Sequence, residues 1–374
     1  MNKFVFKAVA AIAASTATAQ AEDYKVVILQ SQTGGAAFIG APLSEGARLA
    51  ADELNESGFF GEGNKLVYET VDDATDRTQT MSLMTRYTAD PDVLTIMGPT
   101  SSAVAGGAAQ IAEERETHLF ATGNSMEVLE AGKWGSIFTQ PYYVTTPSIA
   151  DYAIDTLNVT KCVTIGIKEI EAYVALTRDF EKYVTERGIE LTSSEGISVN
   201  DSDFSSLATK LAGGDQDCIY ISAPGAQGAN VILQLKQAGL DPSVAIMGHT
   251  AFASPAYIEK GGAAVEGTYM MGDWAPGGSS ELGEAFDAHY RETYGKEADN
   301  WAAIGYSAMR VLAQAIKDAG PNPTRESFNE AVGNVRDVEV VVGGLNFSYD
   351  EERIPYYGMN VLMVQDGAFV VAPE

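Results

Sequence analysis

Short apolar segments alternate with amphipathic ones along most of the chain. Residues 25–30 are apolar at almost every position, which is typical of a β-strand covered on both faces. Residues 42–56 instead repeat apolar side chains at steps of three and four, the spacing of an amphipathic helix. The same cycle predicts further strands at residues 65–71, 93–97 and 118–122 and further helices near residues 78–88 and 101–115. In all, five strands can be drawn before Pro141.

A second series of the same kind begins at Cys162. It predicts strands at residues 162–167, 189–197, 218–222 and 244–249, with helices near residues 173–187, 204–211 and 229–238. A strand-like crossing near residues 268–271, two long helices at 282–294 and 301–319, and β-rich segments over 345–371 follow. Alternating strands and helices indicate βαβ units and parallel sheets. We therefore expect an α/β protein of two similar halves with no Pro- or Ser-rich linker between them.

The length, charge and sparse histidines and cysteines narrow the class of protein. A chain of 374 residues favours two domains over one. The formal net charge of −27 repels phosphate backbones and anionic lipid headgroups, so neither nucleic-acid binding nor membrane insertion is expected. Three histidines and two cysteines lie far apart, without the spacing of a metal site. No metal and no cofactor are expected.

The first 21 residues have the pattern of a secretory signal peptide. Lys3 and Lys7 form a positive start, an Ala-rich apolar stretch follows, and residues 19–21 (Ala-Gln-Ala) match a cleavage site. The alternative is a membrane anchor, but that needs about 20 apolar residues, and this run is shorter and contains hydroxyl side chains. We expect an exported protein whose mature, soluble chain begins near Glu22.

Two loops after predicted strands carry the chemistry of an anion site. Ser101 and Ser102 follow the strand at 93–97 and open a helix, whose free N–H groups and dipole attract an anion. One strand later, Gly123, Asn124 and Ser125 repeat the arrangement. Both loops lie at carboxyl ends of parallel strands, where open α/β sheets bind ligands. Together they could hold one small carboxylate; the alternative is that the serines are ordinary helix caps.

Catalytic patterns are incomplete in this sequence. The glycines of residues 35–40 have the spacing of a P-loop, but Ala41 and Pro42 replace the required Lys and Ser/Thr. The Ser101/Ser102 turn lacks the frame of a nucleophile elbow and has no histidine near in sequence. We expect no enzyme and no catalytic residue. A set of aromatic side chains near strand ends is instead a hypothetical lining for an apolar ligand: Phe38, Tyr142, Tyr143, Tyr173 and Trp274.

From about residue 25 to residue 372 the chain resembles the periplasmic solute-binding proteins of branched-chain amino acid ABC importers. The matching segments are TGGAAFIGAPLSEGARLAADELNESG, VDDATD, GPTSSAVAGGAAQIAEE, ATGNS, LKQAGL, GLNFSYDE and VLMVQDGAF. The resemblance to this Leu/Ile/Val-binding type implies the type I periplasmic-binding-protein fold. Such a fold has two flavodoxin-like, doubly wound parallel-sheet lobes joined by three hinge crossings, with the ligand in the cleft between them. The expected division is signal peptide 1–21, lobe one 22–141 plus 272–345, and lobe two 142–271 plus 346–374.

The resemblance also implies roles for single residues. Ser102 matches the family's carboxylate-binding serine, and residues 123–125 match the loop that holds the ligand's carboxylate and amine. Phe38 matches the aromatic residue of the first loop, and Tyr173 matches the second-lobe tyrosine that closes over the ligand. Residues near Gly225 and Thr250 would complete the site from lobe two.

Two departures from the family pattern concern the ligand amine and a disulfide. The second-lobe motif that supplies an acid for the amine reads MGHTA at residues 247–251 and contains none. Either another acid replaces it or the ligand lacks the amine, as an amide or an aromatic carboxylate would; the candidate acids are Glu169, Glu171 and Asp273. The family's first-lobe cysteines are replaced by Thr75 and Ser101.

Cys162 and Cys218 begin two strands that the flavodoxin-like order places side by side. In an oxidising periplasm they form a disulfide or remain a pair of buried thiols. Taken together, we expect a periplasmic binding component that captures a small carboxylate, with a hydrophobic or branched-chain amino acid as the first choice. It would deliver this ligand to an ABC permease in the inner membrane. The alternative is a sensor that presents its ligand to a membrane receptor.

Overall fold

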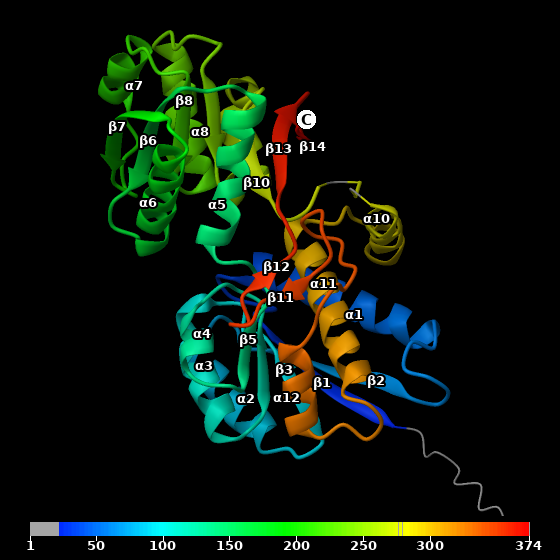
Figure 1. Ribbon diagram of the computed structural model, residues 1–374. Helices are drawn as coiled ribbons and strands as arrows, with labels where there is room; N and C mark the ends of the chain where they lie inside the picture. Colours follow the sequence, from blue (N-terminus) through cyan, green and yellow to red (C-terminus); the bar gives the residue numbers. More distant parts are fainter. Residues whose placement is uncertain (1–21, 276, 279, 374) are drawn as a thin grey trace, which may run out of the picture.

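The computed structural model describes residues 22–275, 277–278 and 280–373 and has two α/β lobes stacked end to end (Figure 1). The expected signal peptide, residues 1–21, lies outside the described residues. The first lobe contains a five-stranded parallel sheet in the order β2-β1-β3-β4-β5. Its strands are β1 (Asp23–Gln30), β2 (Lys65–Asp72), β3 (Val93–Met97), β4 (His118–Ala121) and β5 (Gly135–Ile137).

Helices cover both faces of this sheet, and the side chains of β1 divide between them. Val26 and Ile28 pack into the core formed with one set of helices, and Val27 and Leu29 pack into the core formed with the other. This is why the strand is apolar at successive positions rather than at alternate ones. One set is α1 (Ala37–Glu56), α10 (Glu281–Tyr294), α11 (Asn300–Asp318) and α12 (Arg325–Gly333). The other set is α2 (Arg77–Thr88), α3 (Ser102–Glu114) and the short α4 (Glu127–Glu130).

The second lobe contains a seven-stranded sheet in the order β14-β13-β10-β9-β8-β6-β7. Five of its strands are parallel, and β13 and β14 extend the edge in antiparallel fashion. The parallel strands are β6 (Lys161–Ile167), β7 (Glu190–Ile197), β8 (Cys218–Ser222), β9 (Ala245–Gly248) and β10 (Tyr269–Gly272), and the edge strands are β13 (Asn360–Gln365) and β14 (Ala368–Val371).

The helices of the second lobe also form two layers. On one face lie α5 (Tyr142–Asp151), which continues as a π-helical turn over Tyr152–Thr156, and α6 (Glu171–Glu186). On the other face lie α7 (Ser205–Ala212), α8 (Gly225–Gln237), α9 (Pro255–Gly261) and two short 3₁₀ helices, Thr250–Phe252 and Gly262–Val265. The strand order 2-1-3-4-5, which is that of a flavodoxin-like sheet, therefore occurs in both lobes.

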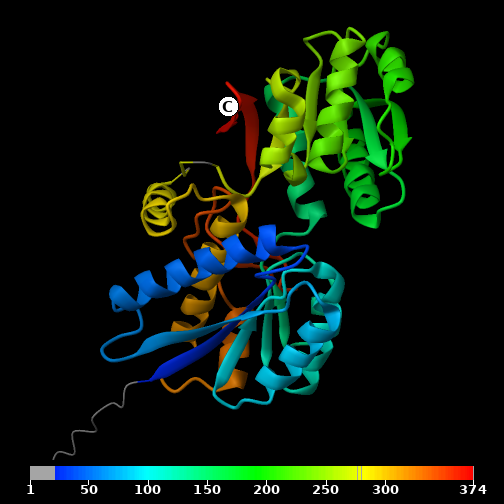
Figure 2. The same cartoon turned by 180° about the vertical axis from the view of Figure 1, so that it is seen from behind.

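The chain crosses between the lobes three times, and hydrogen bonds tie the crossings together (Figures 1 and 2). Gln140, in the first crossing, donates through Nε2 to the Gly358 carbonyl at 2.6 Å and accepts from the Tyr357 N–H at 3.2 Å. The Tyr357 hydroxyl donates to Oδ1 of Asp273, in the second crossing, at 2.8 Å. The two lobes are thus joined at one hydrogen-bonded hinge.

Two boundaries differ from the expected ones. Helix α1 begins at Ala37 rather than at Pro42, so Pro42 lies inside the helix, where it cannot donate the usual backbone hydrogen bond. The change to the second lobe, expected at residue 346, comes later. Phe347 and Tyr357 stack on Phe138 with ring centroids 5.3 Å apart in each pair, and so belong to the first-lobe core. The short strands β11 (Ser348–Tyr349) and β12 (Pro355–Tyr356) lie between these two rings in the sequence.

Cys162 and Cys218 lie directly opposite each other on the parallel strands β6 and β8, with a Cα–Cα distance of 4.5 Å. Of the two alternatives that the sequence left open, the structure has the disulfide.

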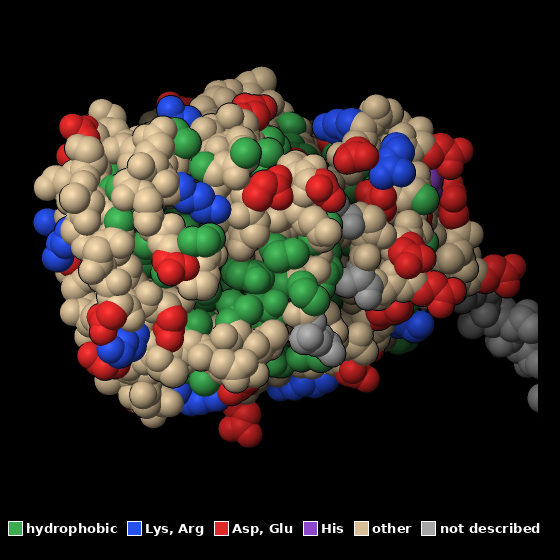
Figure 3. Space-filling model, turned by 90° about the horizontal axis from the view of Figure 1, so that it is seen from above, with side chains coloured by type: hydrophobic (Ala, Val, Ile, Leu, Met, Phe, Trp, Pro, Cys, Tyr) green, Lys and Arg blue, Asp and Glu red, His purple; other side chains and the backbone are tan. Residues whose placement is uncertain are grey.

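The surface carries the expected excess of acid. Figure 3 shows Asp and Glu side chains over the outer parts of the visible face, with Lys and Arg among them, and hydrophobic side chains gathered at its centre. None of the described helices has both the length and the hydropathy that a membrane crossing requires.

Candidate functional site

A cavity of about 590 Å³ lies between the two lobes, at the carboxyl ends of the strands of both sheets. Its position follows from the fold, because the loops after parallel strands open toward this side in each lobe. The first lobe contributes Ala36, Ile39, Leu43, Thr100, Ser101, Ser102, Ala103, Thr122, Gly123, Asn124, Asn300, Trp301 and Ile304. The second lobe and the crossings contribute Thr139, Gln140, Tyr142, Thr145, Ile170, Ala172, Tyr173, His249, Thr250, Ala251, Asp273 and Met359.

The start of α3 presents hydrogen-bond donors to this cavity. The buried strand β3 ends at Gly98, whose φ of +134° is favourable only for glycine and whose Cα packs on the carbonyl of Leu29. Ser101 then occupies the N-cap position of α3, but its side chain makes no capping hydrogen bond. The alternative interpretation of Ser101 as an ordinary cap is therefore wrong for its side chain. No side chain therefore caps the start of this helix.

The second loop packs closely against the first. A Cβ atom on Gly123 would lie only 2.7 Å from Oγ of Ser102, so glycine at this position leaves room for the serine hydroxyl. The buried side chain of Gln30 connects the two loops from below. It accepts from the Thr100 hydroxyl at 2.6 Å and donates to the Thr122 hydroxyl at 3.4 Å. The donors of the first lobe are thus held in place by the sheet beneath them.

The second lobe offers aromatic rings and the Thr250 hydroxyl. The Tyr173 ring lies edge-on to the His249 ring, with centroids 5.3 Å apart. His249 donates from Nε2 to the Ala223 carbonyl at 3.0 Å and accepts at Nδ1 from the Ala251 N–H at 3.4 Å. Burial lowers the pKa of His249 to about 4, so the ring is neutral at pH 7. His249 was missed as a site residue; its place at the end of an apolar strand was the available signal.

One acid lies in the cleft, at the hinge. Of the three candidate acids, Glu169 and Glu171 are exposed and lie outside the lining, whereas Asp273 lines the cavity and is 3% exposed. Burial raises the pKa of Asp273, against the lowering effect of hydrogen bonds from Tyr357 and Asn300. No Lys or Arg occurs among the described residues that line this cavity.

The structure brings together six of the nine predicted ligand-binding residues. The six that line the cavity are Ser101, Ser102, Gly123, Asn124, Tyr173 and Thr250. Phe38 is 69% exposed, because α1 begins early and turns Ile39 and Leu43, not Phe38, toward the cleft. Gly225 packs beneath the Thr250 turn, against the Ala251 carbonyl and Ser254. Ser125 lies one residue beyond the lining, where its carbonyl accepts from the Val128 N–H at 3.2 Å.

These groups are suited to binding a small ligand. Hydroxyls, helix N–H groups and one amide can hold a carboxylate, and the aromatic and aliphatic side chains can cover an apolar group. Both ring nitrogens of His249, the histidine in the cleft lining, already have backbone partners. The described residues contain no cluster of three or more potential metal ligands.

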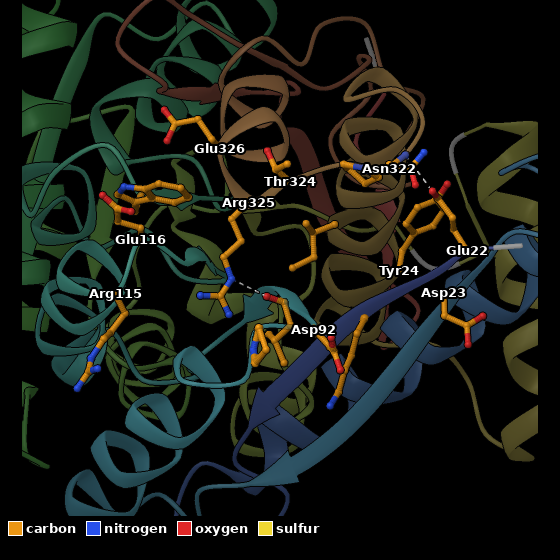
Figure 4. Close-up of a pocket in the computed structure, with 16 residues that line it drawn as sticks. Glu22, Asp23, Tyr24, Asp92, Arg115, Glu116, Asn322, Thr324, Arg325 and Glu326 are labelled. Atoms are coloured by element: carbon orange, nitrogen blue, oxygen red, sulfur yellow. Dashed lines mark hydrogen bonds between the residues drawn. The ribbon is translucent and has the colours of Figure 1, made fainter. Parts of the chain in front are cut away.

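A second cavity, of about 670 Å³, lies at the opposite end of the first lobe (Figure 4). It surrounds the start of β1 and Arg325, whose guanidinium donates to the Val93, Thr88 and Asp90 carbonyls at 2.9, 3.1 and 2.5 Å. All of the residues that line it belong to the first lobe. A ligand there would contact one lobe only and could not stabilise a closed arrangement of two.

Comparison with known proteins gives concordant matches over the whole described chain. A family model described as "Periplasmic binding protein" matches residues 23–368. The Leu/Ile/Val-binding protein homolog 1 of Brucella suis is 28% identical over 366 residues, 96% of each chain.

Two solved structures show the same fold. An ABC transporter substrate-binding protein from Desulfitobacterium hafniense, in complex with Leu, has a TM-score of 0.78 at 18% identity over 94% of this chain and 100% of its own. A solute-binding protein from Rhodopseudomonas palustris, in complex with 3,4-dihydroxybenzoic acid, has a TM-score of 0.74 at 20% identity over 94% and 96%. The predicted two-lobed fold and family are confirmed, and the chain belongs to the periplasmic binding protein family.

Proposed function

We propose that this chain is the substrate-binding component of an ABC importer and captures a small hydrophobic or branched-chain amino acid in the cleft between its lobes. Its Leu/Ile/Val-binding relatives and the leucine-bound structural neighbour support this function. The observation that carries the proposal is the composition of the cleft. Neutral hydrogen-bond donors lie together with aromatic and aliphatic side chains, and no cationic side chain occurs among the described lining residues.

The ligand carboxylate would bind to the first lobe. Ser102 and Ser101 would donate hydroxyl hydrogen bonds, the first N–H groups of α3 would add the helix dipole, and Gly123 and Asn124 would complete the loop on the other side. A carboxylate needs no cation when several oriented N–H and O–H donors converge on it.

The ligand side chain would be covered by the second lobe. Tyr173 and Thr250, with the neutral ring of His249, would close over it when the hinge bends. Contact with both lobes is what stabilises a closed form over an open one. The closed form would then deliver the ligand to a permease in the inner membrane, with no chemical change to the ligand. Export through a cleaved signal peptide over residues 1–21 is part of the same proposal.

A thermal-shift screen of the mature protein against leucine, isoleucine, valine, amides and aromatic acids tests this function. A ligand at 100 times its Kd stabilises the folded protein by about 2.7 kcal/mol, which is readily detected. We expect shifts from aliphatic amino acids. Shifts confined to aromatic acids such as 3,4-dihydroxybenzoic acid would favour the second candidate function, which the Rhodopseudomonas structure motivates. No shift from any of these compounds would reject the amino-acid function.

A further inference from the structure

We propose that Asp273, at the hinge, binds the ammonium group of the ligand and thereby restricts the site to α-amino acids. This inference rests on the proposed function, because it assigns one more contact within the same cleft. It also answers the question raised by the sequence, since the second-lobe motif at residues 247–251 contains no acid.

The carboxylate of Asp273 has hydrogen-bonding capacity to spare. Oδ1 accepts from the Tyr357 hydroxyl at 2.8 Å, and the contact of Oδ2 with Nδ2 of Asn300 is long, at 3.5 Å. An ionised carboxylate offers about four acceptor positions. The backbone carbonyl of Asp273 is occupied separately, by the N–H of Gly343 and the side chain of Asn360. The side chain is therefore only partly satisfied, although it is almost wholly buried.

No cation of the protein compensates this charge. Neither Lys nor Arg lines the cleft in the described part of the chain, and the groups that favour the ionised form of Asp273 are neutral hydrogen-bond donors. A buried carboxylate without a cation is unfavourable, and an ammonium brought by a ligand would remove that penalty. Burial raises the pKa of this carboxyl, as expected for an acid that lacks a positive partner.

The balance of charge in the cleft predicts which ligands are accepted. An amino acid adds one carboxylate and one ammonium, so the cleft with Asp273 keeps a single unit of negative charge. A carboxylic acid of the same shape without the amine would add a second negative charge to a site with low polarity. Sites built to bond a polar group discriminate strongly against analogues that lack it. Asp273 would then act as a selectivity residue against plain carboxylates.

A purely structural role is the competing interpretation of Asp273. Its bond to Tyr357 ties two hinge crossings together, so a substitution could weaken binding of every ligand by loosening the hinge. The two roles differ in what they predict for a ligand without an amine. Only an ammonium contact makes the effect of the substitution depend on the amine.

Isothermal titration calorimetry with leucine and with 4-methylpentanoate, which is leucine without its amine, distinguishes the roles. For the unmodified protein we expect leucine to bind at least about 100-fold more tightly than 4-methylpentanoate. For Asp273→Asn, which retains an acceptor for Tyr357, we expect leucine affinity to fall about 100-fold and 4-methylpentanoate affinity to stay unchanged or rise. Tyr357→Phe is the matched control, since it removes the hinge hydrogen bond and keeps the carboxylate.

Equal losses for both compounds in Asp273→Asn would overturn the inference and leave a structural role. Equal affinity of the unmodified protein for both compounds would overturn it without any variant, so a variant that fails to fold does not block the test. Tight binding of aromatic or aliphatic acids but not of amino acids would also overturn it, while the carboxylate site remained. If no compound of the screen bound at all, the proposed function itself would fail.

Discussion

The two lobes have the same strand order but present different surfaces to the cleft. The first lobe offers most of the hydroxyl groups, an amide and the start of α3, together with the Trp301 ring, whereas the second offers the rings of Tyr173 and His249 and the Thr250 hydroxyl. The difference indicates a division of labour. We expect the first lobe to supply most of the polar recognition of the ligand and the second lobe to exclude water from it when the hinge closes. Both surfaces should contribute to affinity, mainly through the dissociation rate.

The lobes also differ in how they are held together. The second lobe has a disulfide between β6 and β8. The resemblance to the family implies cysteines at the positions of Thr75 and Ser101 in the first lobe, and this chain has none there. Thr75 donates to the Thr33 carbonyl at 3.2 Å and accepts from the Ala36 N–H at 3.0 Å, so hydrogen bonds fasten the loop that precedes α1. The second lobe is thus fastened by a covalent bond, and the first lobe by weaker hydrogen bonds.

The largest expected effect is the loss of the disulfide. Because the bridge spans 56 residues, replacing Cys162 and Cys218 by Ala should lower the free energy of unfolding by about 4 kcal/mol. The loss of stability should be confined to the second lobe, and the stability of the first lobe should be unchanged. Urea unfolding of the variant and of the reduced unmodified protein should agree. An unchanged midpoint would show that the bridge contributes nothing to the second lobe.

The buried histidines give each lobe its own sensitivity to acid. In the first lobe, His118 is hydrogen-bonded to the hydroxyls of Thr95 and Ser136 at 3.0 Å, and burial lowers its pKa to about 3; the pKa of His249 falls to about 4. Both folded values lie below the unfolded value of about 6.5. Each histidine therefore contributes stability that is complete above pH 6.5 and is lost as the pH falls toward its folded pKa.

The expected loss is about 1.4 kcal/mol per pH unit for each histidine, or about 3 kcal/mol each by pH 4. Stability measured by denaturant between pH 7 and pH 4 should show this slope. His118→Gln and His249→Gln should each reduce this dependence of stability on pH by about half. The change should arise in the first lobe for His118 and in the second lobe for His249. An unaltered slope in both buried variants would contradict the assignment.

Ser102 tests the polar surface of the first lobe. Removing one charge-assisted hydrogen bond by Ser102→Ala should weaken leucine binding by about 1.5–3 kcal/mol, or roughly 10- to 150-fold. Ser125→Ala is the matched control, since Ser125 lies just outside the lining and its loss should change Kd by less than about twofold. Calorimetry at constant pH measures both. Equal effects of the two substitutions would reject Ser102 as the anchor.

Tyr173 tests the aromatic surface of the second lobe and has the smallest expected effect. Tyr173→Ala should weaken binding about tenfold through loss of apolar cover over the ligand, and Tyr173→Phe should change it little, because the ring remains. The loss should appear mainly as faster dissociation, which stopped-flow fluorescence would resolve. A change confined to the association rate would contradict the assigned covering role.

Much of the fold could be predicted because the strands are buried on both faces. All five residues of β3 are buried, and the apolar segment at residues 93–97 predicted its bounds correctly. Helices with mixed composition were missed. Helix α5 has Pro147 inside it and no clear apolar stripe, and α12 is short and is stabilised by a capping box of Thr324 and Ser327. Such elements depend on tertiary contacts and local caps more than on periodicity.

The polar half of the site was also predictable, because it follows directly from strand ends and helix starts. Ser102 and Gly123 are placed by local geometry that the sequence motifs describe. The sequence could not single out Asp273 and His249 as site residues. Their place in the cleft depends on burial and on how the two lobes pack together. Phe38 was misplaced for a similar reason: a shift in the start of α1 turned the neighbouring Ile39 into the cleft.

The central claim is that one small amino acid binds both lobes and closes them. Small-angle X-ray scattering of the mature protein, with and without saturating leucine, tests it most directly. We expect leucine to reduce the radius of gyration of the unmodified protein, and 4-methylpentanoate at the same concentration to leave it unchanged. Leucine binding detected by calorimetry without any change in the radius of gyration would contradict closure of the two lobes around the ligand.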